Sequence, residues 1–488
     1  MREILHSALE VAKLRGASYA DARVGDERTR ALATKNGKIG SASDAESLGL
    51  GVRVIADGAW GYAASDDLSR AGVEATARRA VEIARASARV KQSELRLAAE
   101  KPVKAEWTTP IQIDPFTISV EENLDLLLKI DAELRAVAGV TLAETNMNFR
   151  REAQWFVSSE GADIHQTKYW SGVGYAAHAF AGNEIQKRSY PNSYGGQWQS
   201  KGYELIHEWK LLENARRVGE EAVALLKADQ GPQGVYDIIL DGAQLGLQIH
   251  ESVGHPIELD RVLGMEANFA GTSFLTLDKL RKLRYGSEIV NVVADARPEH
   301  GPGLGTFAFD DEGVAAQCTP IIKDGLFTGY LSSRETAHTI GESRSGGTLR
   351  AENWNRLPMI RMTNVSIVPG EKPLTKEQLI ESTDRGIYME TNRSWSIDDK
   401  RYNFQFGTEI GWEIKNGKRV RMLKNPSYSG ITTEFWNAMD AICSKDEWVL
   451  WGTPNCGKGQ PQQVMGTGHG AAPARFRNIQ VGSAYKGN

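Results

Sequence analysis

Apolar residues recur at helical spacing in several stretches of the first half of the chain. Residues 2–15 place them on one stripe, and Gly16 follows where the C-terminal cap of a helix is expected. Ser119 and Glu122 have the spacing of a capping box, which indicates that another helix starts there. The predicted helices are residues 2–15, a stretch from a cap at Ser65 or Asp66 to about residue 88, a stretch after Ser119, and residues 203–227.

Between these helices the apolar and polar residues alternate, as expected for strands. The Asn-Gly pair at 36–37 and the Asp-Gly pair at 57–58 favour tight two-residue turns, so both predict hairpins. Residues 140–190 are rich in β-branched and aromatic side chains and are interrupted by a turn at 160–161. This segment therefore predicts an antiparallel sheet.

The polar run at residues 229–234 is the predicted domain boundary. After it come a short strand, then Asp241, a residue type that caps helices, and then a helix at 243–255. The rest of the chain is mostly strands and turns. The predicted fold is α+β, with an N-terminal α/β domain of mixed sheet and helices at 1–230 and a sheet-rich C-terminal domain at 231–488 that carries the candidate metal-binding helix.

The composition is that of an ordinary globular protein. At 488 residues the chain is too long for one small core, and a net charge of -4 gives no field that would attract nucleic acid or anionic lipid. The N-terminus lacks the basic and apolar segments of a signal peptide, and no apolar stretch is long enough to span a membrane. Three scattered cysteines fit a reducing compartment. We therefore expect a soluble cytoplasmic protein with no nucleic-acid or membrane partner.

The clearest chemical signal is an HExxxH motif formed by His250, Glu251 and His255 near the end of the predicted helix. In the familiar HExxH pattern, two histidines four residues apart lie on one helical face and bind zinc, and the glutamate polarises the water. Here the spacing is five residues, so the two imidazoles would diverge by about 140° on a regular α-helix. A regular helix therefore cannot bring both to one ion.

A π-type turn restores the alignment, and such turns are frequent at functional sites. Gly254 supplies backbone freedom and Pro256 stops the helix directly after His255. We predict a π-bulge or an unwound last turn at residues 252–255. The alternative is that the two histidines are only buried or hydrogen-bonded; the position of Glu251 and the helix-ending residues favour the metal site.

A catalytic zinc normally has three protein ligands, and the motif supplies only two. Glu258 and Asp260 are local candidates for the third. Cys318 and Cys443 lie in apolar runs typical of core residues, whereas Cys456 lies in a polar, Gly-rich turn beside a cation that favours the thiolate. Composition alone makes Cys456 the leading candidate.

Four separated strings resemble the TldD/PmbA metallopeptidases, and specifically the TldD branch that keeps its zinc site. They are HESVGHP at 250–256, FDDEG at 309–313, PMIRMTN at 358–364 and NCGK at 455–458. The resemblance covers nearly the whole chain, and four strings in the right order are much more specific than one motif.

This resemblance implies a zinc-dependent peptidase in which His250, His255 and Cys456 bind Zn²⁺ and Glu251 is the general base. It also implies a dimer around an enclosed chamber, formed with a second copy or with a PmbA (TldE)-type subunit, which only unstructured peptides can enter. Residues 460–470 depart from the better-known TldD sequences, so partner and substrate stay open. Two alternatives are a non-catalytic, chamber-forming partner subunit, which should have a broken HExxxH motif, and a peptide-maturation hydrolase that acts on modified peptides.

Three further features carry secondary expectations. His469 lies between glycines and is expected on an exposed, flexible loop, where it either donates a hydrogen bond to the oxyanion of the reaction or has no role. Arg361 is expected to pair with an internal carboxylate in preference to a substrate terminus. Residues 310–312 are expected to form an acidic turn before Gly313, with no second metal site.

Overall fold

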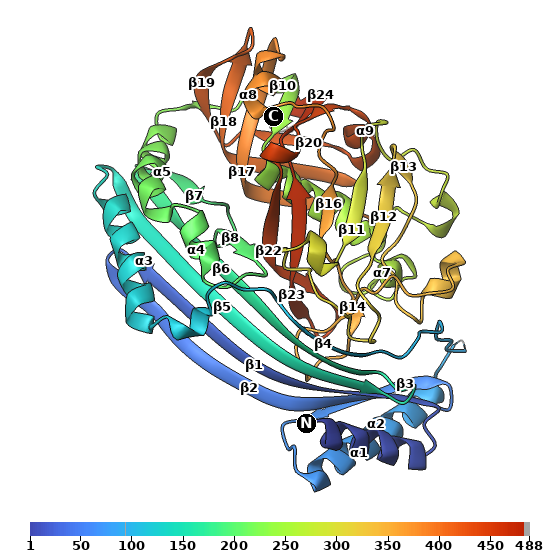
Figure 1. The fold of residues 1–488 in the computed structure, drawn as a ribbon. Helices are drawn as coiled ribbons and strands as arrows, with labels where there is room; N and C mark the ends of the chain where they lie inside the picture. Colours follow the sequence, from blue (N-terminus) through green and yellow to red (C-terminus); the bar gives the residue numbers. More distant parts are fainter. Residues whose placement is uncertain (93, 483–488) are drawn as a thin grey trace.

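A long, curved sheet forms the first half of the molecule, and the second half lies in its concave side (Figure 1). The computed structural model describes residues 1–92 and 94–482. The sheet has the strand order β3-β2-β1-β5-β6-β4, and β7 and β8 also pair with β6. Its strands are β1 (Tyr19–Lys35), β2 (Lys38–Ala56), β3 (Ala59–Ser65), β4 (Lys104–Thr108), β5 (Val140–Ser158), β6 (Asp163–Ala181), β7 (Glu184–Tyr190) and β8 (Gln197–Gln199).

The predicted hairpins of this sheet are confirmed. Asn36 and Gly37 connect β1 to β2 with φ of 48° and 75°, and Asp57 and Gly58 connect β2 to β3 with φ of 53° and 74°. Two consecutive residues with positive φ are what a tight two-residue hairpin turn requires, so these residue types specify the turns. Strands β5 and β6 form the predicted antiparallel pair.

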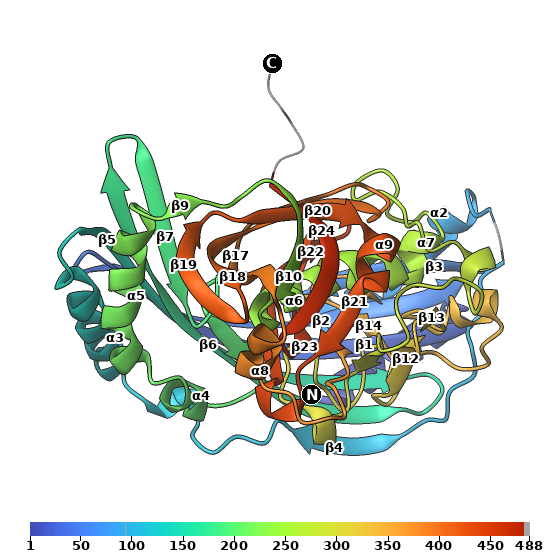
Figure 2. The ribbon, with the colours of Figure 1, turned by 90° about the horizontal axis from the view of Figure 1, so that it is seen from above.

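Helices α3 and α5 lie at one end of the curved sheet and α2 at the other (Figure 2). The capping box at Ser119 is confirmed, because its side chain accepts from the Glu122 backbone N–H and the Glu122 side chain accepts in return. The predicted cap at residue 65 or 66 is wrong: Ser69 caps this helix, and Ser65 ends β3. The helices of the first half are α1 (Arg2–Leu14), α2 (Arg70–Ala88), α3 (Val120–Arg135), α4 (Glu204–Glu208) and α5 (Leu211–Leu225).

The predicted helix at 203–227 is interrupted between α4 and α5. Lys210 has a φ of 44°, a left-handed conformation that a continuous α-helix excludes.

Within the described residues, no helix combines the length and hydrophobicity needed to cross a membrane.

The second half is built mainly from strands, so the predicted α+β fold with a sheet-rich C-terminal region is confirmed. A large sheet has the order β17-β10-β24-β20-β18-β19-β9 with β21 beside β24, and a smaller one has the order β13-β12-β11-β16. Strands β22 and β23 form a separate two-stranded ribbon. The division into domains at residue 230 stays a prediction.

The bounds of the second-half strands are β9 (Asp229–Gln230), β10 (Gly234–Leu240), β11 (Val292–Asp295), β12 (Cys318–Lys323), β13 (Leu326–Phe327), β14 (Leu349–Arg350), β15 (Met359–Ile360), β16 (Val365–Ile367), β17 (Arg385–Ile397), β18 (Asn403–Lys415), β19 (Lys418–Lys424), β20 (Ser427–Ile431), β21 (Met439–Ile442), β22 (Val449–Lys458), β23 (Gln463–Ala471) and β24 (Ala474–Val481). The helices are α6 (Gly242–Ile249), α7 (Leu259–Val262), α8 (Lys376–Glu381) and α9 (Thr432–Asn437).

Buried charges join the two halves of the molecule. Asp311 pairs with Arg23 of β1 at 2.9 Å, and Glu312 pairs with Arg53 of β2 at 3.4 Å. Asp310 instead accepts from three backbone N–H groups. These carboxylates are therefore bound to protein groups in a turn, which agrees with the expectation of an acidic turn.

Candidate metal centre

Helix α6 ends in the π-type turn that the histidine spacing predicts. Asp241 caps its start by accepting from the backbone N–H of Gln244 and of Ala243. Residues His250–Gly254 then form a π turn, in which the His255 backbone N–H donates to the carbonyl oxygen of His250. The predicted bulge is confirmed, and it starts two residues earlier than expected.

Glycine is required at the end of this turn for steric reasons. A Cβ at Gly254 would lie 2.1 Å from the sulfur of Met362, so no larger residue fits without displacement of that side chain. The turn and Pro256 at its end direct His250 and His255 to the same side of the helix, with ring centroids 4.8 Å apart.

The structure brings His250, His255 and Cys456 together. One ligand atom from each lies within 4.8 Å of the others, and all three side chains are buried. The distance from His255 Nε2 to Cys456 Sγ is 3.8 Å. For Zn–N and Zn–S bonds of ordinary length in a tetrahedron, this edge would be about 3.6 Å. The three groups therefore fit one zinc ion with little movement.

A carboxylate orients His255. Glu258 Oε2 lies 3.0 Å from His255 Nδ1, so the imidazole donates there and presents its Nε2 lone pair to the centre. Lys458, from the ribbon, lies 3.5 Å from Glu258 and 2.7 Å from Asp260. Glu258 and Asp260 were the local candidates for the third ligand. Glu258 instead contacts His255 and Lys458, and Asp260 pairs with Lys458.

A second histidine orients His250. His469 Nδ1 lies 3.0 Å from the carbonyl oxygen of Val365, so it carries the hydrogen and its Nε2 is an acceptor. His250 Nδ1 lies 2.7 Å from that Nε2 and must be the donor. The Nε2 of His250 is left with a lone pair, which is the form that binds a metal ion.

The expectation that His469 lies on an exposed, flexible loop is wrong. It is 1% exposed and belongs to strand β23. The flanking glycines serve close packing: a Cβ at Gly468 would lie 2.2 Å from Asn364, and one at Gly470 would lie 1.8 Å from Trp448. Because both ring nitrogens of His469 are already engaged, it has no free N–H for an oxyanion.

Arg361 secures the ribbon that carries Cys456. It is fully buried and donates to the main-chain carbonyls of Gln463 and Cys456. The expectation of a carboxylate partner is therefore wrong, since Arg361 pairs with backbone oxygens. Burial raises the pKa of Cys456, but the Arg361 charge and then His255 lower it, and the net pKa is below the usual value. This environment favours the thiolate that binds zinc.

The pKa values of the two motif histidines suit a ligand role, and those of the other two cysteines do not. Burial lowers the pKa of His250 and of His255, which keeps both imidazoles neutral. Burial raises the pKa of Cys318 to about 11 and that of Cys443 to about 12, so these cysteines stay protonated.

Glu251 forms an ion pair with Arg401, which sequence reasoning missed. Arg401 lies in the turn between β17 and β18, 150 residues from Glu251 along the chain. Burial, and after it the charge of Glu251, raise the pKa of Tyr194, a residue of the first half. The motif predicted Glu251, but no local pattern marks Arg401 or Tyr194.

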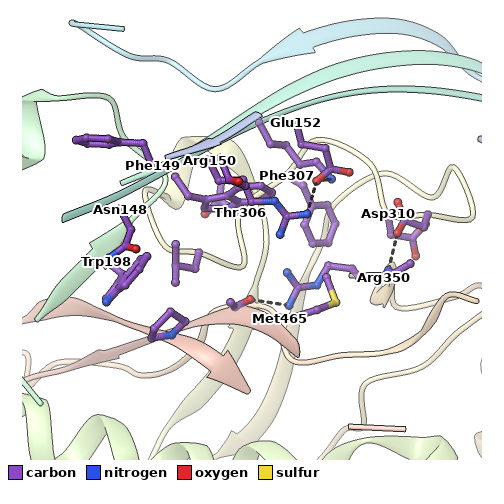
Figure 3. Close-up of a pocket in the computed structure, with 18 of the residues that line it drawn as sticks. Asn148, Phe149, Arg150, Glu152, Trp198, Thr306, Phe307, Asp310, Arg350 and Met465 are labelled. Carbon is purple, nitrogen blue, oxygen red and sulfur yellow. Dashed lines mark hydrogen bonds and ion pairs between the residues drawn. The ribbon is translucent and has the colours of Figure 1, made fainter. Parts of the chain in front are cut away.

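A cavity of about 220 Å³ lies between the ribbon and strands β5 and β6 (Figure 3). Met465, which pairs with Cys456 across the ribbon, forms part of its wall. Arg150 and Arg350 reach toward each other from opposite walls (Figure 3). Arg150 pairs with Glu27 at 3.0 Å and with Glu152 at 3.5 Å, whereas Arg350 is buried and, among the described residues, donates only to main-chain carbonyls. The cavity can therefore receive an apolar or acidic side chain.

Models of one protein family match most of the chain. They are described as PmbA/TldA metallopeptidase domain 1, which matches residues 20–84, the central domain, which matches 113–228, and the C-terminal domain, which matches 233–483.

Individual proteins match over long stretches. A protein of Methanocaldococcus jannaschii named a metalloprotease is 30% identical over 93% of this chain and 95% of its own. A zinc metalloprotease TldD homolog of Saccharolobus solfataricus is 29% identical over 53% of this chain and 54% of its own. The crystal structure of TldE from Thermococcus kodakarensis has a TM-score of 0.71 at 14% identity and covers 98% of this chain and 99% of its own, so it shows the fold.

Proposed function

Because this chain belongs to the PmbA/TldD metallopeptidase family, we propose that it is a zinc-dependent peptidase that hydrolyses unstructured peptides. His250, His255 and Cys456 are the proposed ligands, and Glu251 is the proposed general base. The observation that carries this proposal is the buried group of two neutral imidazoles and a thiolate-favouring cysteine, with the Glu251 carboxylate on the same π turn.

The donor set supports zinc in particular. Nitrogen and sulfur ligands with a neighbouring carboxylate are typical of Zn²⁺, whereas magnesium and calcium prefer oxygen. When bound, zinc would polarise the scissile carbonyl and lower the pKa of a coordinated water to about 7.

Glu251 would perform the proton transfer. Its carboxylate takes one proton from the attacking water as the oxygen–carbon bond forms, and passes it to the nitrogen as the carbon–nitrogen bond breaks. The second water proton stays on the new carboxyl group and then passes to the amine, so the products are a carboxylate and an ammonium group and atoms and charge balance. This role requires that the ion pair between Glu251 and Arg401 opens when substrate is bound.

Peptide substrates would lie between the two halves of the molecule, where the cavity beside the ribbon can take one side chain. The buried centre admits an extended chain more readily than a folded protein. The proposed assembly is a dimer with a second copy or with a TldE-type chain, which the likeness to a TldE fold supports. The proposed location is the cytoplasm.

Substitution of Glu251 by Gln tests this function. The variant should retain zinc and lose at least about 10³-fold in kcat on short unstructured peptides, since its amide cannot accept the proton. Zinc content and initial rates, each with and without a chelator, are the measurements. Glu288→Gln is a matched control, because the Glu288 side chain is 87% exposed in the same half. Unchanged hydrolysis by Glu251→Gln would refute the assignment of the base.

A further inference from the structure

The reaction proposed above needs a group to stabilise the negative charge that develops on the scissile carbonyl oxygen. Arg401 is placed to do this. Its Nη1 donates to Glu251, and its Nε is buried without a hydrogen-bond partner among the described residues. Glu251 directly follows the proposed ligand His250 on the π turn, so its ion pair with Arg401 places this guanidinium beside the centre.

The turn that holds Arg401 is fixed on several sides. Arg401 itself has a φ of 64°, and its carbonyl accepts from the Thr432 hydroxyl at 2.9 Å. The Lys400 carbonyl accepts from the Phe274 backbone N–H at 2.9 Å, and the carbonyl of residue 399 accepts from Arg261 at the same distance. A guanidinium on such a clamped turn is pre-positioned, which is what effective charge stabilisation requires.

Other donors near Glu251 are already in use. His469 has both ring nitrogens engaged. The Tyr194 hydroxyl donates to Asn392 at 2.9 Å. Arg261 donates to three main-chain carbonyls, including that of Thr272 at 2.8 Å. Arg361 and Arg401 each have a buried Nε without a hydrogen-bond partner among the described residues, and of these two it is Arg401 that pairs with Glu251.

We propose that Arg401 is a catalytic residue: it exchanges the Glu251 carboxylate for the carbonyl oxygen of the scissile bond and stabilises the charge that develops there. The proposal rests on the function proposed above. The same exchange frees Glu251 to accept the proton of water. In the absence of substrate, the ion pair keeps each charge partnered in a buried site.

The test compares wild-type protein with Arg401→Ala, Arg401→Lys and the control Lys400→Ala, which removes an exposed cation from the same turn. Each is measured for zinc content and for kcat and KM on a peptide that wild type cleaves. Affinity is measured by calorimetry for two probes. One is a phosphinic peptide that mimics the charged tetrahedral state, and the other is the matching amide peptide in a Glu251→Gln background.

Arg401→Ala should retain zinc, lose about 10²–10³-fold in kcat and a similar factor in affinity for the phosphinic peptide, and bind the amide peptide within about threefold of the parent. Arg401→Lys should recover part of the loss, and Lys400→Ala should behave as wild type. A rise in kcat would overturn the proposal, since it would make Arg401 an inhibitory latch.

An equal loss of affinity for both probes, or loss of zinc, would also overturn it, because Arg401 would then be structural. A failure of the proposed peptidase function can be distinguished from a failure of the role proposed for Arg401. If wild type cleaves no peptide but the phosphinic peptide distinguishes Arg401→Ala from the parent as stated, the charge-stabilising role stands and the substrate class is wrong. If the phosphinic peptide does not distinguish them, the role of Arg401 is refuted.

Discussion

The two sides of the candidate metal centre are built in different ways. One side, the helix side, runs without a break in sequence from the cap Asp241 through α6 and the π turn His250–Gly254 to His255 and Glu258. The other, the ribbon side, is the pair of strands β22 and β23 with Cys456 and His469. Cys456 is 201 residues from His255, and His469 is 219 residues from His250.

This difference shows that the helix cannot form the centre alone. The ribbon supplies one proposed ligand, Cys456, and also sets the tautomer of His250 through His469. The helix side in turn supplies Glu258, which forms an ion pair with Lys458 of the ribbon. The proposed metal site is therefore complete only when both parts are packed together, which would couple metal binding to folding of the second half.

Among the residues that support the proposed ligands, the largest effect is expected from His469 on the ribbon side. His469→Ala should weaken zinc affinity by about 10–100-fold, because it removes the acceptor at 2.7 Å from His250 Nδ1 and leaves the Thr467 hydroxyl at 3.4 Å. His469→Gln should recover part of this affinity, since its amide oxygen can accept that hydrogen. Zinc affinity is measured by competition with a chromogenic chelator, and His300→Gln, at an exposed histidine, is the control.

This result also distinguishes an orienting role from the expected oxyanion role of His469. An oxyanion donor would change kcat and leave zinc affinity unchanged. That outcome would contradict the account of the ribbon side.

A smaller effect is expected at the start of the helix side. Burial and the nearby charge of Glu390 raise the pKa of Asp241, the N-cap of α6, to about 7. The folded protein then binds a proton at this group more tightly than the unfolded chain, whose pKa is about 4. Asp241 therefore reduces the free energy of unfolding as pH rises between about 4 and 7.

Asp241→Asn keeps a capping side chain and removes this charge. Because Asp241 is only partly buried, the variant should gain about 1–2 kcal/mol near pH 8 and nothing below about pH 4. Urea unfolding of metal-free protein at both pH values measures this, with the exposed Asp324→Asn as control. A gain of the same size at both pH values would show that the effect is not due to the charge.

The helix side was largely predictable because its geometry depends on neighbouring residues. The spacing of His250 and His255, with glycine and proline at fixed positions, predicted the π turn that the structure has. On the ribbon side the sequence indicated Cys456 as a candidate ligand but misplaced His469, because the glycines around His469 indicated a loop, whereas they permit close approach of Asn364 and Trp448. Arg401 gave no local signal, since its contact with Glu251 depends entirely on tertiary packing.

The fold shows the same contrast. The hairpins at 36–37 and 57–58 followed from two-residue turn chemistry. The order of the strands in the second half depends on pairings such as β10 with β24, which lie far apart in the chain and have no local signature. Helix boundaries were less reliable, as the cap at Ser69 shows, because several polar residues precede that helix.

The central claim is that the helix and the ribbon together bind one zinc ion. Elemental analysis of purified wild-type protein beside Cys456→Ala tests it most directly. We expect one zinc per chain in the wild type and its loss from the variant during dialysis against a weak chelator. Full retention of zinc by Cys456→Ala would remove the ribbon from the site and contradict the account.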